Sequence, residues 1–142
     1  MYTYNWNTNK WARLKDVPEA KYSSGCAVVD GKELWVVGGM NKDNLETSVS
    51  VEVYDFDTEK WRAGPDLPTP RWSHRCFAVG KKGVAVVGGL NTMTSFALDV
   101  LMYKAADGIW ERIATRLEVT DRFYAAALVD ERSGARRVAK GL

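Results

Sequence analysis

Short apolar runs bounded by turn residues recur along the chain, and they predict β-strands. Residues 25–29 and 34–37 are apolar and rich in β-branched side chains, which is the pattern of strands buried on both faces. The Asp-Gly pair at 30–31 lies between them and favours a tight hairpin turn. Valine alternates with polar residues over 48–53, and apolar residues recur at every second position over 98–102, so each segment predicts a strand with one buried face. No window shows a sustained helical period, and we therefore predict an all-β chain.

The chain repeats itself, with spacings of 50 and then 49 residues between equivalent tryptophans. When residues 4–41 are aligned without a gap on residues 54–91, 15 of 38 positions are identical. Chance composition would give roughly two or three identities. The recurring positions are aromatic residues and a glycine pair: Tyr4, Tyr54 and Tyr103; Trp11, Trp61 and Trp110; Gly38 and Gly39 with Gly88 and Gly89. A repeat of this length predicts that one supersecondary unit occurs several times.

Four short strands per unit, a glycine pair and a spaced tyrosine and tryptophan resemble the kelch repeat. The resemblance is strongest over residues 2–113 and weakens after Arg122. It implies kelch-type β-propeller blades, each a four-stranded antiparallel sheet stacked face to face on the next. Large flat side chains such as Tyr54 and Trp61 are expected to fill the gaps between blades.

The phase of the repeat predicts an incomplete ring in one chain. The expected units are a half-blade at 2–14, full blades at 22–64 and 72–113, and a degenerate half-blade at 122–138. Because propellers close with ~4–8 blades, three explanations are open. The chain is a fragment of a longer kelch protein, or two chains form a homodimer of six blades in which the half-blades pair, or the blades form an open stack with exposed strand edges.

Composition and charge narrow the classes of partner. A net charge of +2 is too small to predict binding to nucleic acid or to a membrane surface. The longest apolar stretches, 34–40 and 84–90, are far shorter than the ~20 residues of a membrane span. The first ten residues lack the pattern of a secretory signal, and two cysteines do not make a disulfide framework. We therefore predict a cytoplasmic protein.

The residues that could carry catalysis are few. A single histidine, His74, excludes any site that needs two histidines from this chain. We expect His74 to be a structural hydrogen-bonding residue at the start of an inner strand. Cys26 and Cys76 occupy equivalent positions and are expected to be buried thiols without a zinc-binding spacing. We predict no catalytic residue, no metal and no cofactor.

A basic residue precedes an aromatic one where each unit enters its first strand. The resemblance places this connection on the same face as the loop after the glycine pair, so an acidic or polar peptide is the expected partner. The alternative is that the basic residue pairs with backbone or solvent and the aromatic residue packs between blades. We also expect Arg71 to contribute to binding but little to folding. The predicted partner-binding residues are Lys21, Tyr22, Asn41, Lys42, Arg71, Trp72, Asn91, Arg122 and Phe123.

The resemblance to kelch propellers implies a protein-interaction module rather than an enzyme. It also implies a place in a larger scaffold, an actin-binding protein or a substrate receptor of a ubiquitin ligase. The alternative is a fragment of a kelch-fold enzyme, such as a metal-dependent oxidase or a sugar epimerase. Because one fold hosts many functions, the resemblance alone does not decide between these classes.

Overall fold

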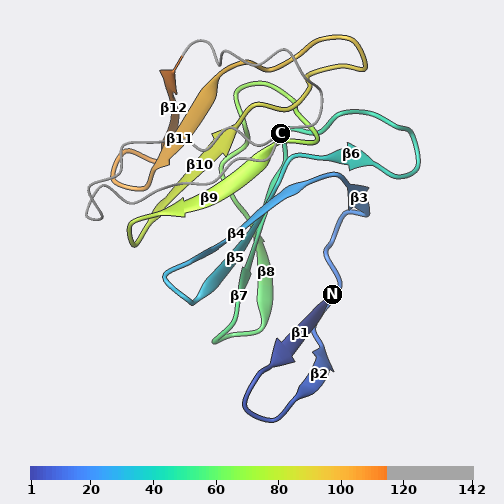
Figure 1. Ribbon diagram of the computed structural model, residues 1–142, viewed down its shortest axis with the longest axis vertical. Coiled ribbons are helices and arrows are strands. Elements are labelled where there is room, and N and C mark those ends of the chain that lie inside the picture. Colours follow the sequence, from blue (N-terminus) through green and yellow to red (C-terminus); the bar gives the residue numbers. More distant parts are fainter. Residues whose placement is uncertain (115–142) are drawn as a thin grey trace.

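The computed structural model describes residues 1–114, which form strands β1 to β12 and no helix. The strands make two four-stranded antiparallel sheets and two two-stranded ones (Figure 1). The predicted all-β class, with four-stranded propeller blades that do not close a ring within these residues, is confirmed. The predicted half-blade at 122–138, with Arg122 and Phe123, lies outside the described residues.

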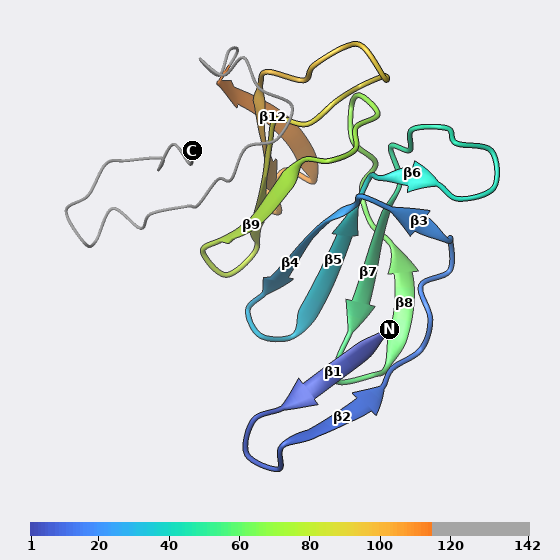
Figure 2. The ribbon, with the colours of Figure 1, turned by 45° about the vertical axis from the view of Figure 1, so that its right-hand side comes forward.

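The first complete blade has its four strands in sequence order, and each strand pairs antiparallel with the next strand of the sheet (Figure 2). The turn between its first two strands holds Asp30 and Gly31 at positive φ, as a tight hairpin turn requires. The strands of this blade are β4 (Gly25–Val29), β5 (Glu33–Val37), β7 (Val51–Asp55) and β8 (Lys60–Ala63). A hairpin of two strands, β1 (Tyr2–Asn5) and β2 (Lys10–Arg13), precedes the blade in the chain.

The second blade repeats the first, with a β-bulge between Val100 and Leu101. Its innermost strand lies beside β4 of the first blade. Two short strands, β3 (Lys21–Tyr22) and β6 (Met40–Asn41), pair at one end of the first blade, and a single bridge between Trp72 and Leu90 takes their place in the second. The strands of the second blade are β9 (Arg75–Val79), β10 (Gly83–Val87), β11 (Val100–Lys104) and β12 (Ile109–Ala114).

The hydrophobic core lies where the two blades face each other. Burial of these side chains is the main favourable contribution to folding. The rings of Trp35 and Tyr103 meet across this interface with their centroids 5.1 Å apart. The buried members of the core are Ala27, Val29, Trp35, Val37, Val51, Val53, Leu67, Val84, Val86 and Leu101.

Two strands depart from the predicted alternation. In β7 the residues Val51 to Tyr54 are all buried, because Glu52 on the polar side forms a buried ion pair. In β11 the prediction placed Val100 and Met102 on the buried face, but Leu101 is the buried residue and the other two are half-buried. Leu101 belongs to the core between the blades, so the neighbouring blade decides which side of β11 is covered.

The repeated tryptophans tie each blade to the segment before it. The Trp61 ring packs on Tyr54 at 5.1 Å, and its indole N–H donates to the Lys15 carbonyl oxygen at 3.3 Å. Trp110 repeats this arrangement on Tyr103 and donates to the Pro65 carbonyl at 2.9 Å. These rings therefore form contacts between consecutive units.

Gly25 permits the close approach of the two innermost strands. Its N–H donates to Nε2 of His74 at 3.2 Å. A Cβ on Gly25 would lie 2.4 Å from Sγ of Cys76 and 2.7 Å from the imidazole ring of His74. Any larger residue would force the second blade away from the first, so glycine is needed for the inter-blade packing.

Candidate functional site

One end of the two blades carries seven of the nine residues that the sequence predicted for partner binding, all but Arg122 and Phe123. Figure 2 shows the β3–β6 ribbon and the loops after the glycine pairs at the end opposite the β4–β5 turn. We call residues 21–22, 40–48, 71–72 and 90–97 the loop face. The sequence prediction named residues in all four segments, and the structure brings these four segments to one end of the molecule.

The glycine pair fixes the base of the first loop. The Gly39 N–H donates to the Arg71 carbonyl oxygen at 2.9 Å, and Gly39 has a φ of 105°. A Cβ there would lie 2.2 Å from Oγ of Ser24. Only glycine combines this backbone conformation with so close an approach. The pair therefore joins the loop of the first blade to the segment that enters the second.

Lys21 lies beneath the surface of the loop face. Its side chain is 1% exposed, and its Nζ is 2.6 Å from Oε2 of Glu52 and 3.6 Å from Oε2 of Glu19. Nζ also donates to Oγ of Ser50 at 2.6 Å. A hydrogen bond from Asn41, helped by Ser50 and the Lys21 charge, lowers the pKa of Glu19. A partner could reach the Lys21 charge only by displacing these carboxylates.

Arg71 is also enclosed. Its side chain is 1% exposed, and its Nη2 is 3.0 Å from Oδ1 of Asp99. Nη1 donates to the Gly88 carbonyl oxygen at 3.3 Å. The other oxygen of Asp99 accepts a hydrogen bond from Nε of Arg112 at 3.0 Å. This burial does not agree with the expectation that Arg71 contributes little to folding, because a buried cation with a single buried carboxylate partner supports the structure around it.

The aromatic residues of the loop face differ in exposure. Tyr22 is exposed, and its hydroxyl donates to Sδ of Met40 at 2.7 Å. Trp72 is half-buried, and its backbone pairs with Leu90. The buried indole N–H of Trp72 has no hydrogen-bond acceptor among residues 1–114.

The two asparagines hold the bases of their loops. Oδ1 of Asn41 accepts hydrogen bonds from the N–H groups of Asp43 and Asn44 at 2.8 and 3.3 Å. Nδ2 of Asn91 donates to the Pro70 carbonyl oxygen at 2.8 Å. Lys42, the next residue after Asn41, is exposed. Asn41 and Asn91 therefore stabilise the conformation of their loops, whereas the ammonium group of Lys42 is exposed to solvent.

Two apolar residues at the loop tips belong to the predicted loop surface but are not among the predicted partner-binding residues. Leu45 is 60% exposed and Met93 is 62% exposed, one on each loop. Large apolar side chains in otherwise polar turn segments were the available signal. They are the most exposed hydrophobic side chains of the loop face.

A cavity of about 420 Å³ adjoins Arg71. Asn91 and Phe96 contribute to its walls from the second loop, and Asp99 and Arg112 from the second blade. Phe96 supplies apolar surface, and the guanidinium of Arg112 is half exposed. The cavity therefore offers an apolar wall beside a cation, a combination that suits one side chain of a bound peptide.

Residues 1–114 bring together no group of three or more histidine, cysteine and acidic side chains able to hold a metal ion. His74 is buried and hydrogen-bonded to Gly25, as expected. Cys76 is half-buried, and burial raises the pKa of its thiol. Cys26, expected to be buried, is exposed, because it projects from the side of β4 opposite Ala27 and Val29, which pack in the core.

Among the described residues there is also no helix with the length and apolar character of a membrane span.

Comparison with protein families agrees with the blade geometry. Residues 21–68 match the family model described as the Kelch motif, a range that runs from β3 past the end of β8. A comparison with curated proteins gives no match. The second blade repeats the strand order and the glycine pair of the matched one. The segment 21–68 is therefore a kelch motif, and the blade that follows it has the same architecture.

Proposed function

We propose that this chain is a protein-interaction module that binds a peptide segment of a partner on its loop face. Kelch repeats are typically non-catalytic interaction modules, which supports the general class. The observation that carries the proposal is the exposure of Leu45 and Met93 at the tips of loops whose bases are held by hydrogen bonds. A loop backbone that is already held by hydrogen bonds loses little further entropy when its apolar side chains bind a partner.

The predicted partner-binding residues divide between contact and support. Tyr22 and Lys42 are exposed and would contact the partner. Lys21 and Arg71 are paired beneath them and would position the surface. Carboxylates of an acidic partner segment would form ion pairs with Lys42 and Arg112. Apolar residues of the same segment would pack on Leu45 and Met93.

We expect the double variant Leu45→Ser with Met93→Ser to lose at least about tenfold in affinity for peptides selected on the wild-type chain. The peptides come from a random peptide display library, and affinity is measured by fluorescence anisotropy. Ile109→Ser is the matched control, because Ile109 is 56% exposed on the β11–β12 hairpin, away from the loop face. Peptides that bind the double variant and the wild type equally would overturn the loop face as the binding site.

The proposal also concerns assembly into a larger propeller. Among the described residues β1 pairs only with β2, whereas β7 and β11 pair on both sides. Trp11, which is equivalent to Trp61, is 70% exposed. We infer that this hairpin is completed by further strands, either from a longer scaffold or substrate-receptor protein or from a second copy in a six-bladed homodimer. A solution mass of twice 15.9 kDa by light scattering would support the homodimer, and a monomer would support the longer protein.

The ligase-receptor and actin-binding roles, and the alternative of a kelch-fold enzyme, concern the protein of which these blades would be a part. They are distinct from the peptide-binding function that the exposure of Leu45 and Met93 supports.

A further inference from the structure

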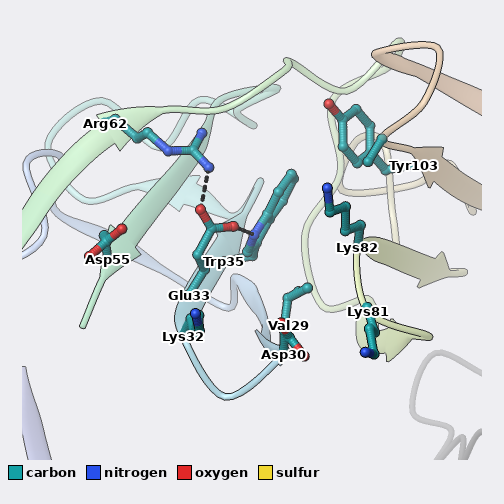
Figure 3. A pocket seen from close by; sticks show the side chains of 11 residues that line it. Val29, Asp30, Lys32, Glu33, Trp35, Asp55, Arg62, Lys81, Lys82 and Tyr103 are labelled. Carbon is teal, nitrogen blue, oxygen red and sulfur yellow. Dashed lines mark hydrogen bonds and ion pairs between the residues drawn. The ribbon is translucent and has the colours of Figure 1, made fainter. Parts of the chain in front are cut away.

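A second groove lies between the two blades at the end opposite the loop face. It has a volume of about 330 Å³ and is bounded by the β4–β5 turn of the first blade and the β9–β10 turn of the second (Figure 3). We call it the basal groove. Its size is at the lower limit of ligand sites, which suits one large side chain with its flanking backbone.

The inner wall of the basal groove is aromatic. Trp35 is 4% exposed, and its ring meets that of Tyr103 at a centroid distance of 5.1 Å. The Trp35 indole N–H donates to Oε2 of Glu33 at 3.0 Å, which satisfies its one polar group and fixes the ring. The remaining edge of the ring pair is apolar surface that an incoming side chain can cover.

Of the three carboxylates that line the groove, Glu33 is already paired with a cation. Nη2 of Arg62 is 2.6 Å from Oε1 of Glu33, so both carboxylate oxygens of Glu33 have partners. Asp55, on the same wall, accepts hydrogen bonds from the N–H and hydroxyl of Thr58, and these hydrogen bonds lower its pKa. Asp30 also lies on the wall of the first blade.

The opposite wall is basic. Lys81 and Lys82 lie there on the β9–β10 turn, and a third lysine, Lys32, lies on the β4–β5 turn of the first blade. All three are exposed, and within residues 1–114 no carboxylate is at ion-pair distance from their ammonium groups. Figure 3 shows the Lys82 side chain beside Tyr103, facing Trp35 across the groove. Unpaired cations beside an aromatic wall are complementary to a ligand that is apolar at one point and negative next to it.

We propose that the basal groove binds an acidic peptide segment of a partner protein, with one apolar side chain against Trp35 and Tyr103 and neighbouring carboxylates on Lys81 and Lys82. The site is distinct from the loop face, so the chain would have two peptide-binding surfaces at opposite ends. A partner that reaches both ends would bind more tightly than either contact allows, since the second contact becomes intramolecular.

The test uses the complete chain and a fluorescein-labelled peptide of glutamates with one central phenylalanine, measured by fluorescence anisotropy at low salt. We expect Lys81→Gln with Lys82→Gln to weaken binding about tenfold. Lys10→Gln with Lys15→Gln removes the same charge from the N-terminal region and should leave the affinity within about twofold of wild type. The same peptide with glycine in place of phenylalanine should bind more weakly than the original.

Each alternative has its own outcome. Equal affinity of the two double lysine variants would mean a non-specific charge effect and would overturn the proposal. Equal binding of a lysine peptide with central phenylalanine would exclude the acidic ligand. The Leu45→Ser with Met93→Ser variant should lose less affinity for the glutamate peptide than the Lys81→Gln with Lys82→Gln variant does, and the reverse order would move the site to the loop face. Failure of the basal groove thus leaves the proposed function of the loop face intact.

Discussion

Replacing Arg71 with methionine should destabilise the fold by about 3 kcal/mol. Methionine keeps most of the volume of the side chain but removes the cation, so Asp99 would lose its buried partner. Removal of one member of a buried ion pair is costly because the remaining charge stays out of water. Arg112 still contacts Asp99, which places the effect at the lower end of the usual range. Urea denaturation followed by tryptophan fluorescence gives the change in the free energy of unfolding.

Two further variants show whether the charge is responsible. Arg13→Met removes a cation from the exposed pair with Asp16 and should cost far less. Arg71→Met combined with Asp99→Leu removes both buried charges and should recover most of the lost stability, because neither charge is then left without a partner. If Arg71→Met and Arg13→Met had equal effects, the ion pair at Arg71 would not support the fold.

The blades could be predicted from sequence because their signals are local. Apolar runs of strand length, the Asp-Gly turn at 30–31 and the recurring Tyr and Trp positions each depend on neighbours close in the chain. Their repetition then identified the unit. The side of β11 that is covered could not be predicted in this way, because the first blade, and not the sequence of β11, buries Leu101. The exposure of Cys26 depends in the same manner on what faces β4.

The candidate site shows a sharper limit of sequence reasoning. The basic residue recurs at Lys21 and Arg71, but its acidic partner does not recur at the same position. Lys21 pairs with Glu52, which lies on β7 two positions after Ser50. Arg71 instead pairs with Asp99, the residue just before β11. Alignment on Tyr54 and Tyr103 makes Asp99 the equivalent of Ser50, so the carboxylate has moved by two residues along one side of the strand. The repeat therefore indicated a common cation, and only the tertiary structure showed that the cation is buried and paired.

Acid should weaken the fold between pH 6.5 and pH 5 through His74. Burial, with the positive charges of Arg71 and Arg75, lowers the pKa of His74 from 6.5 to about 3. The unfolded chain therefore takes up a proton below pH 6.5 while the folded chain does not, and stability is lost as the pH falls toward 3. The slope approaches 1.4 kcal/mol per pH unit, which gives about 2 kcal/mol between pH 6.5 and pH 5.

The single histidine of the chain makes this prediction direct to test. Urea denaturation at intervals from pH 7 to pH 5 measures the slope in the wild type. In the variant His74→Gln an amide oxygen can still accept the Gly25 N–H, and the slope over this range should disappear. The wild type also permits a test without substitution, since one histidine gives one imidazole Cε1 proton signal in the NMR spectrum. That signal should keep the shift of the neutral ring at pH 5 in the folded chain. A titration midpoint near 6.5 in the folded state would show that the imidazole is in contact with water, and the inter-blade packing of His74 against Gly25 would then be wrong.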